Sequence, residues 1–102
     1  MRYRRANSFL ADYRRLSARE QARFQDAVRK VIEACEGHSG RGVPCWPPSL
    51  RVKPVTNAPG IYEMTWSFSG PDGRATFDYV TEEGELVLRW RRTGGHEIFR
   101  EP

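Results

Sequence analysis

The segment at residues 61–68 reads IYEMTWSF and contains the clearest alternating pattern in the chain. Its even-numbered positions are apolar and the odd-numbered positions between them are polar, a period of two that is typical of a strand with one buried face. Residues 74–80 (RATFDYV) and 86–92 (LVLRWRR) alternate in the same way. Turn-forming sequences at 69–73 (SGPDG) and 82–84 (EEG) separate these segments. The sequence therefore predicts an antiparallel meander of three strands.

A shorter fourth strand is predicted at residues 50–55, where Leu50 and Val52 alternate with Arg51 and Lys53. Between this strand and the helical region, residues 37–49 contain three glycines and three prolines, which predicts a loop.

The chain before residue 37 has a helical pattern. Apolar residues recur at helical spacing over residues 8–16, which predicts a first helix. Ser17 and Glu20 have the spacing of a capping box, in which the hydroxyl and the carboxylate each accept a hydrogen bond from the other residue's backbone N–H. Apolar residues then recur along one face up to residue 35, which predicts a second helix. Because the two helices adjoin, they must form a tight antiparallel hairpin.

Helices followed by strands indicate an α+β fold rather than alternating βαβ units. With 102 residues the chain is long enough for one hydrophobic core. We expect a single domain over residues 1–102, with a helical hairpin at about 8–36, a four-stranded, mainly antiparallel sheet at about 50–93 and a tail at 94–102. The apolar face of the sheet packs on the hairpin. Residues 1–5 are either a short strand or a frayed end.

Composition excludes several classes of protein. No apolar run approaches the roughly 18 residues of a membrane span, and no signal-peptide core is present, so we expect no membrane association and a cytoplasmic location. Two cysteines, Cys35 and Cys45, show no spacing typical of a zinc site, and no metal or other cofactor is expected. The net charge is +4, and residues 1–31 hold nine basic and three acidic side chains. This clustering favours a polyanion or an acidic protein as partner.

The strand alternation also predicts a polar face on the sheet, opposite the core. Such a face is either a solvated surface or a binding surface. The fourth strand adds Lys53 and Arg51 to it if that strand pairs alongside the meander. The predicted members from the meander are Glu63, Thr65, Arg74, Thr76, Asp78, Arg89 and Arg91.

The last strand leads into the segment RRTGGHEIF at residues 91–99. Two glycines allow a sharp turn, so that His96 lies near the end of the arginine-bearing strand. Histidine transfers protons near pH 7, arginine binds phosphoryl oxygens, and Phe99 can stack on a base. Metal-free RNA cleavage needs these groups, because a base must take the ribose 2′-hydroxyl proton while cations stabilise the phosphorane. Taken singly, His96 is equally well a surface or capping residue, and Phe99 a packing residue.

The chain resembles the RelE/ParE toxin superfamily, in particular its YafQ-like and HigB-like branches. The resemblance rests on the helical hairpin, the meander and the closing sequence RTGGHEIF at 92–99. The opening SFLADY at 8–13 and the sequence GIYEM at 60–64 with Gly73 and Arg74 resemble the same family. The resemblance implies an mRNA interferase, the toxin of a type II toxin–antitoxin pair. Such an enzyme cleaves messenger RNA in the ribosomal A site by metal-independent attack of the 2′-hydroxyl. It also implies a cognate antitoxin, through which any oligomer would form.

Carried over to this chain, the resemblance implies that His96 is the catalytic histidine. Arg74 matches the basic residue after the central hairpin, and Phe99 matches the terminal aromatic. Arg91 joins the catalytic group, and Glu63 is either a second general base or a structural partner of an arginine. The RNA-binding candidates are Lys53, Arg51, Arg89, Arg92 and Phe99.

Two other functions remain open at this stage. The first is a ParE-like toxin that blocks a topoisomerase by protein contact and cleaves no RNA. The second is a degenerate member that binds RNA or a partner without catalysis. The additional histidines of YafQ-like toxins and the strand lysines of RelE have no counterpart in this sequence.

Overall fold

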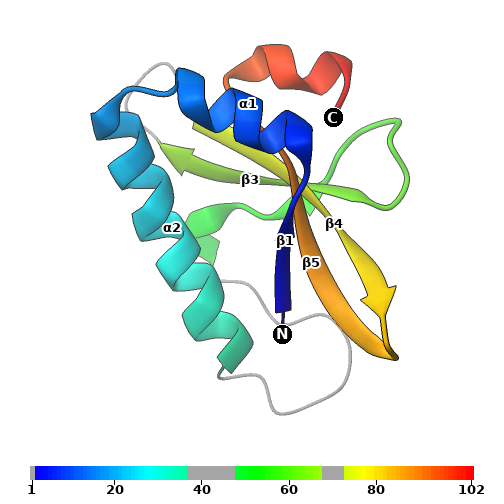
Figure 1. The fold of residues 1–102 in the computed structure, drawn as a ribbon. Coiled ribbons are helices and arrows are strands. Elements are labelled where there is room, and N and C mark those ends of the chain that lie inside the picture. Colours follow the sequence, from blue (N-terminus) through cyan, green and yellow to red (C-terminus); the bar gives the residue numbers. More distant parts are fainter. Residues whose placement is uncertain (1, 37–47, 68–72) are drawn as a thin grey trace.

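The computed structural model describes residues 2–36, 48–67 and 73–102, without the side chains of Cys35, Glu36 and Ser67 (Figure 1). Most of the predicted loop at 37–49, including Cys45, and most of the predicted turn at 69–73 lie outside the described residues. The elements follow in the order β1 (Arg2–Arg5), α1 (Asn7–Arg15), α2 (Ala18–Glu36), η1 (Pro48–Leu50), β2 (Lys53–Pro54), β3 (Ile61–Ser67), β4 (Gly73–Glu82), β5 (Glu85–Gly94) and η2 (His96–Arg100). Helices precede the meander, as the α+β prediction required.

The sheet has five strands in the order β1-β5-β4-β3-β2 and is mixed, which corrects the prediction of four strands. The meander pairs β3, β4 and β5 antiparallel, and β2 pairs antiparallel with β3. The added strand is β1, which pairs parallel to β5, with Tyr3 opposite Leu88. Ion pairs of Arg2 with Glu85 and of Arg4 with Glu82 accompany this pairing. Residues 2–5 are therefore a strand and not a frayed end.

The fourth predicted strand is much shorter than expected. It consists of Lys53 and Pro54 alone, since Leu50 ends the 3-10 helix η1 and proline has no backbone N–H to extend a ladder. Arg51, expected in this strand, precedes it and is exposed, with a positive φ of 48°. Lys53 does join the sheet, opposite Glu63.

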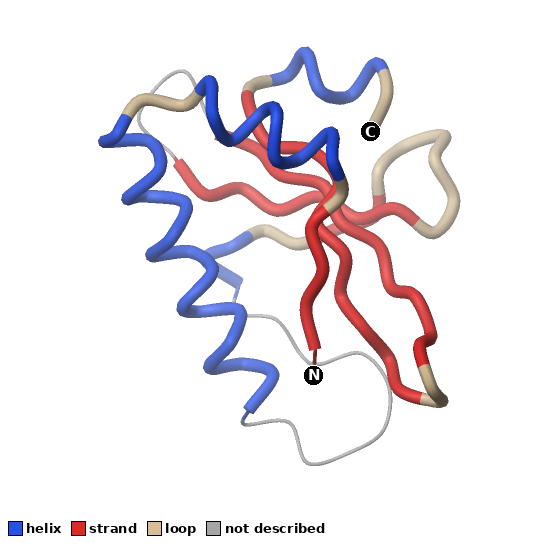
Figure 2. The backbone as a smooth tube through the Cα atoms, in the orientation of Figure 1, coloured by secondary structure: helices blue, strands red, loops and turns tan. Residues whose placement is uncertain are grey.

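The two predicted helices form and are joined by a short connection between α1 and α2 (Figure 2). The capping box forms as expected. The Ser17 backbone N–H donates to Glu20 Oε1 at 2.9 Å, and the Glu20 N–H donates to Ser17 Oγ at 3.1 Å. These bonds satisfy two N–H groups that have no partner within α2. Among the described residues, no helix is long and apolar enough to cross a membrane.

The core lies between the hairpin and one face of the sheet, as predicted. The Phe24 ring of α2 meets the Trp66 ring at 6.1 Å and the Trp90 ring at 5.4 Å, both edge-on. Met64 and Phe77 of the same sheet face are at most 1% exposed. The apolar side chains of the strands are thus buried against the helices, and the polar side chains lie on the other face of the sheet. The 3-10 helix η2 packs against β4 and β5.

Candidate functional site

The antiparallel register builds the polar face. It places Asp78 opposite Arg89 on β5, and Thr65 and Glu63 of β3 opposite Arg74 and Thr76 of β4. Residues opposite one another on one sheet face have neighbouring side chains.

Asp78 is the centre of an arginine cluster on this face. Its carboxylate accepts hydrogen bonds from Arg89 Nε at 3.0 Å, from Arg89 Nη2 at 2.7 Å and from Arg91 Nη1 at 3.0 Å. The bidentate bond with Asp78 raises the pKa of Arg89 above its usual value. Two predicted cations are therefore gathered side by side, and one carboxylate offsets part of their charge.

The remaining polar-face residues form two further contacts. Arg74 Nη1 donates to Thr65 Oγ1 at 2.8 Å. Lys53 Nζ lies 3.7 Å from Glu63 Oε1, so the ion-pair partner of Glu63 is a lysine, whereas the structural alternative for Glu63 was an arginine partner. The Glu63 side chain is 13% exposed, whereas that of Lys53 is 68% exposed. Lys53 is thus the more accessible of these two charges.

Residue 102 contacts the polar face. The Pro102 carbonyl oxygen accepts hydrogen bonds from Thr76 Oγ1 at 2.9 Å and from Arg91 Nε at 3.0 Å. Thr76 is completely buried. The sequence carries no signal for this contact, because every residue of the chain has a carbonyl oxygen.

Arg92 lies between α1 and the segment that follows η2, because its guanidinium donates both to Asp12 and to the Glu101 carbonyl. Simple alternation would set Arg92 on the apolar face with Trp90, but a register shift after Thr76 pairs Arg92 with Thr76 of the polar face instead. Arg92 Nε donates to Asp12 Oδ2 at 2.6 Å, and the Thr93 N–H donates to the same oxygen at 3.2 Å. The bond to Asp12 raises the pKa of Arg92.

Asp12 was missed as a structural residue, although the sequence contains a signal for it. It lies three residues after Phe9 and four before Leu16, on the apolar stripe of α1. A carboxylate on such a stripe needs a cationic partner when the stripe is buried. Asp12 is 6% exposed and has that partner in Arg92.

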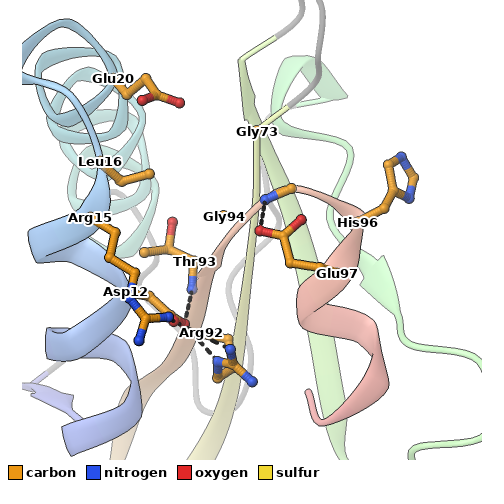
Figure 3. A pocket seen from close by; sticks show the side chains of 11 residues that line it. Asp12, Arg15, Leu16, Glu20, Gly73, Arg92, Thr93, Gly94, His96 and Glu97 are labelled. Atoms are coloured by element: carbon orange, nitrogen blue, oxygen red, sulfur yellow. Dashed lines mark hydrogen bonds and ion pairs between the residues drawn. The ribbon is translucent and has the colours of Figure 1, made fainter.

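His96 begins η2 directly after the Gly94–Gly95 turn, as the sequence predicted. Its ring is exposed and meets the Phe99 ring edge-on, with the centroids 5.8 Å apart. Within the described parts of the chain, the imidazole has no hydrogen bond and no ion pair. Figure 3 shows the ring directed away from Asp12 and Arg92. His96 and Phe99 are thus brought together, whereas neither contacts the Asp78 cluster.

A cavity of about 510 Å³ lies between the end of α1, the start of α2 and the β5–η2 turn (Figure 3). Beside it, the Gly95 N–H donates to Glu97 Oε1 at 3.0 Å, and this bond lowers the pKa of Glu97. The described residues contain no group of three or more His, Cys, Asp or Glu side chains able to hold a metal ion. The lining residues are Asp12, Arg15, Leu16, Glu20, Gly73, Arg92, Thr93, Gly94, Gly95, His96 and Glu97.

Comparison with known proteins places this architecture among RelE-like folds. The structure is similar to a chain in the crystal structure of the intact Escherichia coli RelBE toxin–antitoxin complex, with a TM-score of 0.54 and 14% sequence identity. The similarity covers 92% of this chain and 94% of that chain. The sequence matches no protein-family model and no curated protein. At this level of identity, the likeness establishes the fold.

Proposed function

We propose that this protein is the toxin of a type II toxin–antitoxin pair and that it cleaves messenger RNA on the ribosome without a metal ion. The observation that carries the proposal is the register pair of Arg74 with Gly94. Arg74, the basic residue after the central hairpin, lies opposite Gly94, which precedes His96 by two residues, at the edge of a face that also bears Arg89 and Arg91. The likeness of the fold to a chain of a toxin–antitoxin complex supports the same assignment.

In the proposed reaction, the His96 imidazole accepts the proton of a ribose 2′-hydroxyl. The 2′-oxygen attacks the adjacent phosphorus, and the 5′-oxygen of the next nucleotide leaves and takes up a proton. The products are a 2′,3′-cyclic phosphate and a 5′-hydroxyl. Arg74 and Arg91 stabilise the charge of the phosphorane, since guanidinium groups match phosphoryl oxygens. Glu63 is the second candidate for the base.

The remaining residues hold the RNA strand. Phe99, which meets His96 edge-on, stacks on an unpaired base. Lys53, Arg51 and Arg89 attract backbone phosphates. Arg92 also attracts the RNA backbone while its guanidinium stays paired with Asp12. A cognate antitoxin with an acidic or amphipathic segment would suppress activity by covering this surface, and any oligomer would form through the antitoxin. The proposed site of action is the cytoplasm, on the ribosome.

The experiment compares induced expression of the wild-type protein with that of His96→Ala. We expect the wild type to arrest growth and to produce new 5′ ends in translated messages, mapped by primer extension. His96→Ala should reduce cleavage by about 10²–10⁴-fold, the usual contribution of a general acid or base. Arg100→Ala is the matched control, because Arg100 is exposed on the same 3-10 helix and has no role in the proposed chemistry. Full cleavage by a folded His96→Ala protein, checked by circular dichroism, would overturn the assignment of His96.

One observation favours a second candidate function, a ParE-like toxin that blocks a topoisomerase by protein contact. His96 stands apart from the Asp78 cluster, in which the guanidinium groups of Arg89 and Arg91 already have protein partners. Growth arrest with intact messages and damaged DNA would support this candidate. Expression without any growth defect would indicate a member that binds RNA or a partner without catalysis.

A further inference from the structure

The contact of residues 101–102 with the polar face has the chemistry of an anion site. An arginine Nε–H and a threonine hydroxyl converge on one oxygen, that of Pro102, at 3.0 and 2.9 Å. The same two donor types bind phosphate oxygens in nucleic-acid complexes. The carbonyl oxygen of the chain therefore lies where a phosphate oxygen would accept these bonds.

This contact limits access to the donors. Thr76 has no exposed surface, and the Arg91 side chain is 32% exposed. The other bond of the Arg91 guanidinium goes to Asp78, so its Nε–H is the donor directed at residue 102. An RNA phosphate can receive the Thr76 and Arg91 bonds after the Pro102 oxygen has left them.

Residues 101–102 differ from η2 in how they are held. Ile98 is 1% exposed and fixes η2 on the sheet, whereas Glu101 is exposed. Two further bonds hold Glu101: its carbonyl accepts from Arg92 Nη1 at 3.0 Å, and its N–H donates to the Ile98 carbonyl at 3.3 Å. A cavity of about 400 Å³, lined in part by Ser8, Ala58 and Ile61, borders Arg91 and Pro102 and leaves space beside the segment.

We infer that residues 101–102 are an autoinhibitory strap that occupies a phosphate subsite formed by Thr76 Oγ1 and Arg91 Nε. The strap must leave the polar face before a single-stranded RNA binds there. This inference rests on the proposed function, because it assigns the ligand class of the same face. It adds Thr76 as a phosphate ligand and residues 101–102 as the competitor.

The test measures binding of a short single-stranded RNA whose riboses are 2′-O-methylated, so that it cannot be cleaved by 2′-hydroxyl attack. Fluorescence anisotropy gives the Kd for the full chain and for a variant lacking Glu101 and Pro102. If the strap covers the subsite about 90% of the time, its removal lowers the apparent Kd about tenfold. Adding Thr76→Val to the shortened chain should remove part of this gain. Glu101→Ala is the control, because it keeps both carbonyl oxygens, and we expect its Kd to equal that of the full chain.

The outcomes separate this inference from the proposed function. Equal Kd values for the full and shortened chains overturn the strap while leaving RNA binding intact. Absence of RNA binding in every variant, with folding checked by circular dichroism, argues against the proposed function itself. If the shortened chain fails to fold, the double substitution Glu101→Gly with Pro102→Gly loosens the strap without removing it. That variant should then bind the RNA more tightly than the full chain, and an unchanged Kd overturns the strap.

Discussion

At the scale of single residues, the most consequential contact outside the polar face is the ion pair of Asp12 with Arg92. It joins α1 to β5 across 80 positions of the sequence. The carboxylate also accepts a bond from the Thr93 N–H, so its removal takes the acceptor from a backbone donor and leaves Arg92 with the Glu101 carbonyl but no anion. The side chains of Asp12 and Arg92 are 8% and 22% exposed, and solvent screening of the pair is therefore weak.

We expect Asp12→Ala to lower the free energy of unfolding by about 3 kcal/mol, the usual cost of leaving a buried charge unpaired. Urea denaturation followed by tryptophan fluorescence measures this change. The control is Asp26→Ala on α2. Asp26 pairs with Arg29 at 3.2 Å, but both side chains are about two-thirds exposed, so the expected loss is below about 1 kcal/mol. Equal losses in the two variants would contradict the structural role of Asp12.

The sequence predicts the residue types of the polar face because strand alternation assigns each side chain to one face. It does not predict their partners. Asp78 bridges two arginines since the register sets Asp78 opposite Arg89, and register depends on the whole meander. The Pro102 oxygen and the direction of the His96 ring depend on backbone contacts and a turn for which the sequence has no pattern.

At the scale of elements, patterns among neighbouring residues predict the secondary structure correctly, whereas pairing between distant parts of the chain is not predicted. The capping box and the apolar periodicity predict α2 because each concerns residues within a few positions of one another. Strand β1 is not predicted by such patterns, because RYRR has no clear alternation and Val87, the partner of Arg2, is 85 residues away in the sequence. The truncation of β2 follows from Pro54 and could have been predicted from that residue.

Gly73 of β4 lies very close to the Trp66 side chain of β3. A Cβ on Gly73 would lie 2.5 Å from the Trp66 ring, which is buried and donates its indole N–H to the Arg74 carbonyl at 3.0 Å. The ring cannot move without losing this bond and its edge contact with Phe24. We therefore expect Gly73→Ala to destabilise the fold by about 1–3 kcal/mol, the usual cost of overpacking.

Thermal unfolding followed by circular dichroism measures the effect of Gly73→Ala. The matched control is Gly95→Ala, where a Cβ would first meet the Glu97 carboxylate at 2.6 Å. That carboxylate is the end of a flexible, exposed side chain and can rotate away, so the expected loss is smaller. A Gly73→Ala protein as stable as the wild type would mean that the Trp66 ring has room to shift.

At the scale of the whole molecule, charge separates two surfaces. Residues 1–31 carry nine basic and three acidic groups, whereas the polar face of the sheet combines Lys53 and three arginines with Glu63 and Asp78. In the proposed function, the helical surface faces ribosomal RNA and the polar face holds the message. The two surfaces should then be separable by their dependence on salt, because each neutralised phosphate releases counterions.

For a short single-stranded RNA in the absence of ribosomes, contacts from Lys53, Arg74, Arg89 and Arg91 would give a slope of log K against log salt of about −3, at about −0.7 for each phosphate. Lys53→Met should reduce the magnitude of this slope by about 0.7, because its ammonium group is exposed on the polar face. Lys30→Met removes an equal charge from the exposed surface of α2 and should leave the slope unchanged. Anisotropy titrations at several salt concentrations supply the slopes. If both substitutions reduce the magnitude of the slope by the same amount, the RNA binds the helices as much as the sheet, and the polar face is not its specific binding surface.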